Sequence, residues 1–145
     1  MKERELRQRE IRALIRTFAI KKQADLVERL RQKGFDCTQA TISRDINDMG
    51  LKKLSGGGYV LAEDLHLQRM VRDLVISIVS TGNLLLVKAQ AGTAPGVAAA
   101  LDDAKLADVL GSVSGDDTIL VVCGDTETAV SLHETLGMYQ GAHAK

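Results

Sequence analysis

Residues 34–62 read GFDCTQATISRDINDMGLKKLSGGGYVLA, and this stretch decides the fold of the first half of the chain. Thr38 is a favourable helix N-cap, and Gly50 is the kind of residue that often follows the end of a helix. The apolar face between them consists of Ile42, Ile46 and Met49. Two short apolar runs then flank Ser55–Gly58, a pattern typical of a β-hairpin with a flexible tip. The stretch therefore predicts a helix that starts after Thr38, followed by a hairpin over residues 51–62.

Two further helices are predicted upstream of this stretch. The first has an apolar stripe at helical spacing, formed by Ile11, Leu14, Ile15 and Phe18. The second spans about Gln23–Lys33, with Gly34 after its end and Phe35 packing back on the helix pair. Three short helices followed by a hairpin are typical of the winged-helix variety of the helix-turn-helix fold. The same pattern also fits a three-helix protein-interaction module.

Charge is divided unevenly along the chain, although the 145 residues have a net charge of zero. Residues 1–60 carry 14 Lys and Arg against 8 Asp and Glu, a net charge of +6. Residues 61–145 carry 5 against 11, a net charge of −6. A basic domain suits a polyanion such as DNA, and an acidic one suits a cationic or neutral ligand. The two halves are therefore expected to perform two different tasks.

The exposed face of the third predicted helix carries side chains suited to the major groove of DNA. Gln can bond to adenine, Arg can fork onto guanine, and Ser or Thr can bond to bases or phosphates. Lysines at the start of the hairpin are candidate phosphate contacts. The predicted DNA-binding residues are Gln39, Thr41, Ser43, Arg44, Lys52 and Lys53. Further candidate phosphate contacts are Arg4, Arg7, Arg9, Lys21 and Lys22. The alternative is a solvated polar face, on which Arg44 pairs with Asp48 one turn away.

The second half of the chain predicts a small α+β domain. Residues 63–73 (EDLHLQRMVRD) are polar and are predicted to form a linker, in part helical, between domains at 1–62 and 74–145. After the linker we expect the order ββαββα, with a helix over Pro95–Asp103 and a final helix capped by Thr126. Such an order predicts a small antiparallel sheet with two helices on one face.

Several other classes of protein are excluded by composition. The longest apolar run, near Leu84–Val87, is far too short to span a membrane, and the charged start MKERELRQRE has no signal-peptide core. Cys37 and Cys123 have no CxxC partner, so we expect small buried thiols in a reducing cytosol and no disulfide framework or metal site. The sequence also lacks a nucleophile–base pair and a Gly-rich phosphate loop. We therefore expect a cytoplasmic protein that is not an enzyme and does not contact membranes.

Acidic residues are the remaining chemistry of the second domain. They are Asp102, Asp103, Asp108, Asp116 and Asp117. The Gly-Asp-Asp step at 115–117 has a simple explanation, because Gly and Asp favour turns. Alternatively, the acids bind a cation: a guanidinium forks onto carboxylates, and Mg²⁺ also fits an Asp pair. The magnesium alternative would be an enzyme tethered to DNA, but no base accompanies the acids; a purely structural oligomerisation module is a further alternative.

Three segments, in this order and spacing, resemble the bacterial arginine repressors. They are GFDCTQATISRDI (34–46), the Pro95-Gly96 step before a predicted helix, and GSVSGDDTILVV (111–122). The resemblance covers nearly the whole chain and implies an N-terminal winged-helix DNA-binding domain and a C-terminal α+β domain that forms trimers, which stack into hexamers. It also implies that L-arginine is a corepressor bound between the trimers. The implied operators are paired, imperfectly palindromic arginine boxes near genes of arginine biosynthesis and catabolism.

The resemblance also assigns roles to individual residues. Ser43 and Arg44 match the Ser-Arg pair of the family's recognition helix, and Gln39 precedes them in a similar place. The arginine-binding aspartates of the family are matched by Asp102, Asp116 and Asp117. Asp116 and Asp117 match the pair that holds arginine across the interface between trimers. Asp102 matches an aspartate that lines the same pocket.

The helix after Pro95-Gly96 departs from the family pattern. It looks shorter by a turn, and Val97–Ala100 carries only apolar side chains where the family has a glutamine that contacts arginine. Losing one hydrogen bond to a ligand costs about 1–3 kcal/mol, or about tenfold and more in affinity. The alternative is a regulator of the same family that responds to another cationic metabolite or needs a paralogous partner subunit. The retained aspartate pair argues against a complete loss of ligand binding.

Overall fold

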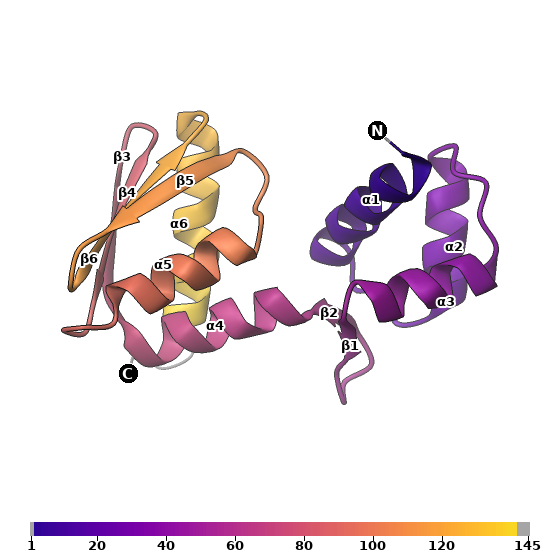
Figure 1. Cartoon of the computed structure of the whole chain (residues 1–145), viewed down its shortest axis with the longest axis horizontal. Coiled ribbons are helices and arrows are strands. Elements are labelled where there is room, and N and C mark those ends of the chain that lie inside the picture. The colour runs from indigo at the N-terminus through magenta and orange to yellow at the C-terminus, as the bar shows by residue number, and fades with distance from the viewer. Residues whose placement is uncertain (1, 142–145) are drawn as a thin grey trace. The chain divides into compact units, whose positions relative to one another are not determined.

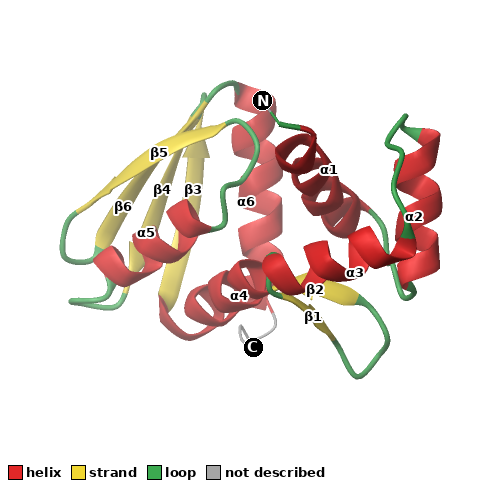
Figure 2. Ribbon diagram, turned by 45° about the vertical axis from the view of Figure 1, so that its right-hand side comes forward, coloured by secondary structure: helices red, strands yellow, loops and turns green. Residues whose placement is uncertain are grey.

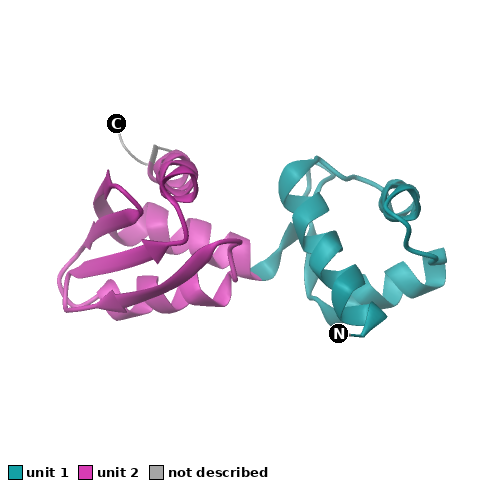
Figure 3. Cartoon of the chain, turned by 90° about the horizontal axis from the view of Figure 1, so that it is seen from above, with its two compact units in different colours: residues 1–62 teal, residues 63–145 magenta. Residues whose placement is uncertain are grey.

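The computed structural model of the chain describes residues 2–141 and divides it into two compact units (Figure 3). The first unit comprises residues 1–62 and the second residues 63–145. Each unit has a separate cluster of buried apolar side chains.

The first unit contains the three helices and the hairpin that the sequence predicts (Figure 1). The helices are α1 (Glu3–Thr17), α2 (Gln23–Gln32) and α3 (Gln39–Asp48), and the hairpin strands are β1 (Leu51–Lys53) and β2 (Tyr59–Leu61). The strands pair antiparallel, with Leu51 opposite Leu61 and Lys53 opposite Tyr59. Its core is centred on side chains from all three helices and β2, including Ile11, Leu26, Leu30, Ile42 and Leu61.

Local signals set the ends of α2 and α3 as expected. Thr38 caps α3, because its hydroxyl accepts a hydrogen bond from the Thr41 N–H at 3.3 Å. Helix α2 ends at Gln32, and Gly34, which follows the C-cap Lys33, has a φ of +90° in the left-handed region. The Phe35 N–H then donates to the Leu30 carbonyl at 3.0 Å, the bond that defines a Schellman cap. This cap turns Phe35 back against the core.

Phe18 was expected on the buried stripe of the first helix, and that prediction is wrong. Helix α1 ends at Thr17, and the extended backbone of Phe18 leaves its side chain 43% exposed. The Arg29 guanidinium lies 3.9 Å from the centre of its ring. Ile20 fills the core instead, at 2% exposure.

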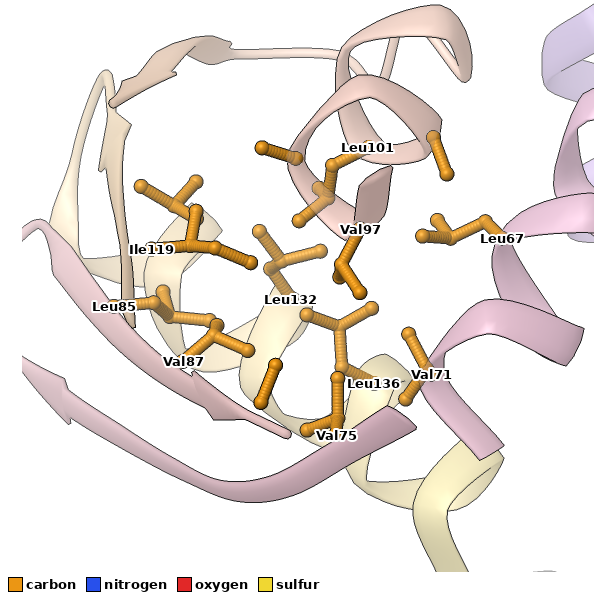
Figure 4. Packing of buried hydrophobic residues seen from close by; sticks show 14 of the residues in the cluster. Leu67, Val71, Val75, Leu85, Val87, Val97, Leu101, Ile119, Leu132 and Leu136 are labelled. Atoms are coloured by element: carbon orange, nitrogen blue, oxygen red, sulfur yellow. The ribbon is translucent and has the colours of Figure 1, made fainter. Parts of the chain in front are cut away.

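The predicted linker at residues 63–73 is part of a helix, α4 (Ala62–Leu74), that packs into the second unit. Its apolar side chains have the spacing i, i+3, i+4, i+7, namely Leu67, Met70, Val71 and Leu74. Figure 4 shows Leu67 and Val71 directed at Val97 and Leu136 in the core. Only part of this segment was expected to be helical, because the charges on the outer face of α4 hide the stripe in the composition of the segment.

A four-stranded antiparallel sheet forms the frame of the second unit (Figure 2). Its strands lie in the order β3-β4-β6-β5. In chain order the elements are β3 (Val75–Thr81), β4 (Leu84–Ala89), α5 (Ala94–Asp103), β5 (Val109–Ser114), β6 (Thr118–Cys123) and α6 (Thr126–Gly141). The predicted order ββαββα and the α+β class are thereby confirmed.

Helices α5 and α6 pack on the inner face of the sheet, against alternate residues of β4 and β6. These inner residues include Leu85, Val87, Ile119 and Val121. One detail of α6 differs from expectation. Its cap is Asp125, whose Oδ1 accepts from the Thr128 N–H at 2.7 Å, and Thr126 is the first helical residue.

Candidate nucleic-acid interface and ligand site

The exposed face of α3 presents most of the predicted base-reading side chains. Gln39 and Arg44 are exposed, and Ser43 is half-buried. Thr41 is also half-buried, and its hydroxyl lies 3.1 Å from the Thr38 hydroxyl within the N-cap. One of the hydrogen bonds that its hydroxyl can form is therefore used at the start of the helix. The alternative Arg44–Asp48 pair does not form among the described residues, since Asp48 accepts from Arg4 Nη2 at 2.8 Å.

The hairpin brings further positive charge to the first unit. Lys52 and Lys53 are exposed on β1, and the Lys53 ammonium lies 5.7 Å from the centre of the Tyr59 ring. The Tyr59 N–H donates to the Ile20 carbonyl at 3.0 Å, which ties the hairpin to the segment between α1 and α2. Lys21 follows directly, and its side chain passes beside Gly57 at the tip. This tie therefore holds an exposed lysine of the α1–α2 segment next to the hairpin.

Asp45 is a buried charged residue that the sequence analysis did not single out. It lies on α3 directly after Arg44, yet it is only 2% exposed and is the sole buried charged residue in the described part of the chain. Arg7 of α1 forks onto it, with Nε 2.5 Å from Oδ2 and Nη2 3.0 Å from Oδ1. Gln8 adds a third bond at 3.1 Å to Oδ1. Arg7 was a candidate phosphate contact, but the fork commits its guanidinium to α3.

Hydrogen bonding controls the ionisation of this buried pair. Burial alone would raise the pKa of the Asp45 carboxyl. The bonds from Arg7 and Gln8 outweigh burial and hold that pKa below its usual range. The same bond to Asp45 raises the pKa of Arg7. Both groups therefore stay charged at neutral pH, which is what a lasting tether between α1 and α3 requires.

The second unit places Asp116 and Asp117 together on the turn between β5 and β6. Asp116 Oδ2 accepts from the Gly92 N–H at 3.1 Å, and its carbonyl accepts from the Ala94 N–H at 3.1 Å. The Asp117 carbonyl accepts from the Ala89 N–H at 2.8 Å. The turn is thus fixed against the loop that leads into α5. Both aspartates are exposed, so their carboxylates keep lone pairs open to a cation.

A lysine that the sequence analysis missed lies close to this aspartate pair. Lys88 Nζ donates to Thr118 Oγ1 at 2.8 Å, and the Thr118 hydroxyl donates to Asp117 Oδ1 at 2.9 Å. Lys88 precedes the end of β4 and pairs with Thr118 across the sheet. Cross-strand register was the signal that could have located it.

Asp102 lies apart from the aspartate pair within one chain. It accepts from the Ser112 hydroxyl at 3.1 Å and lines a pocket of about 340 Å³ between α5 and β5. It stands near the end of α5, eight residues after Ala94, which is about 12 Å along a helix. The structure therefore brings Asp116 and Asp117 together, but it does not bring Asp102 to them. No group of three His, Cys, Asp or Glu side chains able to hold a metal ion is found among residues 2–141.

Both cysteines are buried free thiols, as predicted. Burial raises the pKa of Cys37 and of Cys123. Across the described residues, no helix has both the length and the apolar character needed to cross a membrane.

Comparison with known proteins shows similarity along the length of the chain. Residues 2–66 match the family model for the arginine repressor DNA binding domain, and residues 71–137 match the model for the arginine repressor C-terminal domain. An arginine repressor of Pelotomaculum thermopropionicum is 46% identical over 127 residues, covering 80% of this chain and 84% of that protein. An arginine repressor of Thermus thermophilus is 42% identical over 139 residues, covering 88% of this chain and 85% of that protein. An arginine repressor of Desulforudis audaxviator is 39% identical over 146 aligned residues, covering 93% and 97%.

Proposed function

The chain belongs to the arginine repressor family of DNA-binding regulators, and from this we propose that it is a cytoplasmic repressor that uses L-arginine as its corepressor. It acts as a hexamer on paired arginine boxes near genes of arginine biosynthesis and catabolism. The observation that carries the arginine part of the proposal is the Asp116–Asp117 turn, which is exposed and anchored to the backbone of the loop before α5.

DNA recognition is proposed for α3 and the hairpin. Gln39, Ser43 and Arg44 supply base contacts from the start of α3, and Lys52 and Lys53 bind phosphates from β1. Thr41 contributes its methyl group and the hydrogen-bonding capacity that its hydroxyl keeps beside the contact with Thr38, whereas its backbone N–H is already bound to Thr38. A lysine contact to phosphate releases bound counterions, so binding is expected to weaken steeply as salt rises.

The ligand chemistry follows from the acids of the second unit. A guanidinium offers two parallel N–H donors that match carboxylate geometry, and the α-amino group offers a second positive charge. Asp116 and Asp117 bind one arginine together with Asp102 of another subunit, since Asp102 lies near the other end of α5 in its own chain. Lys88 limits the number of cations that the aspartate pair can hold, because its ammonium already balances part of the charge near Asp117.

Self-association is proposed for the outer face of the sheet. One row of aligned side chains crosses all four strands, and every member is exposed: Val79 56%, Leu86 38%, Leu120 36% and Val113 65%. The neighbouring row is polar, with Ser77, Lys88 and Thr118 in register. An apolar band with a polar border is typical of a protein interface. A second copy of the chain covers this band in the proposed trimer.

Arginine acts by shifting the population of assembled states. The net charge of −6 over residues 61–145 means that six copies repel one another where their acids meet. A cationic ligand relieves this repulsion and favours the arrangement of subunits that presents the winged helices to paired half-sites.

The proposal is tested by binding to a duplex with paired palindromic arginine boxes, with and without millimolar L-arginine, at two salt concentrations. Salt-sensitive binding that arginine strengthens supports the proposal. Salt-sensitive binding that is indifferent to arginine removes arginine as the ligand. The absence of specific binding in both conditions contradicts operator recognition.

A second candidate ligand is favoured by the apolar start of α5. Val97, Ala98 and Ala100 are buried against the core, and they offer no hydrogen bond to a ligand. In one case, another cationic metabolite binds in place of arginine. In the other, a paralogous subunit completes the pocket. Calorimetric titration with arginine, citrulline, ornithine and lysine distinguishes these cases, because only the true ligand gives saturable heat at low concentration.

A further inference from the structure

Two ion pairs join α3 to α1 along one line of contact. Arg7 forks onto Asp45, and Arg4 Nη2 lies 2.8 Å from Asp48 Oδ2. The acidic partners are three residues apart on α3, and the arginines are three residues apart on α1. The two acids therefore share one face of α3, and the two arginines share one face of α1. The inner pair is buried, with side-chain exposures of 13% and 2%, whereas the outer pair is open, at 61% and 48%.

The buried pair sits directly behind the surface that faces DNA in the proposed function. Asp45 follows Arg44 in the chain, and successive residues of a helix point about 100° apart. A bond that fixes Asp45 toward α1 therefore fixes the direction in which Arg44 and Ser43 point. The start of α3 is held independently, because Arg31 of α2 donates to the Cys37 carbonyl from Nε at 3.1 Å and from Nη2 at 3.0 Å.

Building on the proposed DNA recognition by α3, we propose that Arg7 and Gln8 are positioning residues that set the rotation of α3 through Asp45. They increase the preference of the protein for operator over other DNA, and they do not bind phosphate. A planar guanidinium suits this task, because its two parallel N–H groups fix both the distance and the angle of the carboxylate. Gln8 bonds to the same oxygen as Arg7 Nη2, so three donors define the position of one side chain.

The test measures two quantities for the full-length chain, using a duplex that the wild type selects from a randomised library and a scrambled duplex of equal length. The first is the ratio of the two affinities, and the second is the slope of log affinity against log salt. The variants are Arg7→Gln, Arg7→Lys and the uncharged change Gln8→Leu. Lys2→Gln is the matched control, because it removes the same charge from an exposed position directly before α1 that is not among the candidate phosphate contacts.

The expected result is a loss of discrimination with unchanged binding to scrambled DNA. Arg7→Gln lowers the affinity ratio by about 5- to 150-fold, the worth of one base contact, while its salt slope matches that of Lys2→Gln. Arg7→Lys also lowers the ratio, because an ammonium cannot form the fork. Gln8→Leu lowers the affinity ratio less than Arg7→Gln does, and its salt slope equals that of the wild type.

Two outcomes would overturn the inference. If Arg7→Gln weakens both duplexes alike and reduces the salt slope by about 0.9 beyond the control, while Arg7→Lys restores the wild type, then Arg7 binds phosphate. If the variants keep the wild-type ratio, the pair has no positioning role. Should Arg7→Gln fail to fold, Gln8→Leu and Arg7→Lys decide the question. Failure of the proposed DNA recognition shows separately, because the wild type itself then selects no sequence.

Discussion

Replacing Asp45 by alanine is expected to destabilise the first unit far more than the same change at Asp48. Asp45→Ala leaves three donors, two on Arg7 and one on Gln8, without their acceptor in a buried position. Removing one partner of a buried ion pair typically costs about 3–5 kcal/mol. Asp48→Ala removes a pair whose members are 61% and 48% exposed, and such pairs are worth about 0–1 kcal/mol.

The assay is denaturant unfolding, monitored by hydrogen exchange and mass spectrometry in peptides from α1 and α3. Local exchange is needed because a chain of two units does not guarantee two-state unfolding. The double variant Arg7→Met with Asp45→Leu is expected to lose less stability than Asp45→Ala, since it leaves no buried charge unpaired. Equal, small losses in Asp45→Ala and Asp48→Ala would refute the argument that the buried fork holds α1 and α3 together.

Three further predictions concern the ionisation of Asp45, the packing of α4 and the carboxylate of Asp117. The lowered pKa of Asp45 contributes stability that is present above the unfolded value of 3.8 and is lost as pH falls through the lower folded value; acid unfolding of Asp45→Asn is expected to lack this component. Leu67→Ala is expected to cost the second unit about 2–5 kcal/mol in denaturant unfolding, while exposed His66→Ala costs under about 0.5 kcal/mol. Asp117→Ala is expected to weaken L-arginine binding about 10- to 150-fold in calorimetry, and wild-type affinity would contradict the proposed site.

Periodicity predicted most of the fold, because the helices and strands each bury one face. The stripe of α4 has the same i, i+3, i+4, i+7 spacing as the other helices, and it was overlooked only because its outer face is charged. Phe18 was misplaced for a different reason. Its spacing fits the stripe of α1, but the helix ends one residue earlier and the chain turns away. A pattern of apolar residues does not reveal where the backbone leaves the helix.

Residues whose role depends on a distant partner were the ones that the sequence could not reveal. Asp45 looks like a surface acid on a polar helix, and only Arg7, 38 positions away, makes it a buried one. Lys88 gains its place near Asp117 from strand register across the sheet. The exposed candidates were easier, since Gln39 and Arg44 need only the correct helix face to reach solvent.

The most direct test of arginine as the corepressor is the affinity for L-arginine measured by calorimetry with and without the operator duplex. If arginine is a corepressor, the operator must strengthen arginine binding by the same factor by which arginine strengthens operator binding. The expected gain is about 5- to 150-fold, the range of a typical coupling free energy of about 1–3 kcal/mol. An arginine affinity that is the same with and without operator would contradict it.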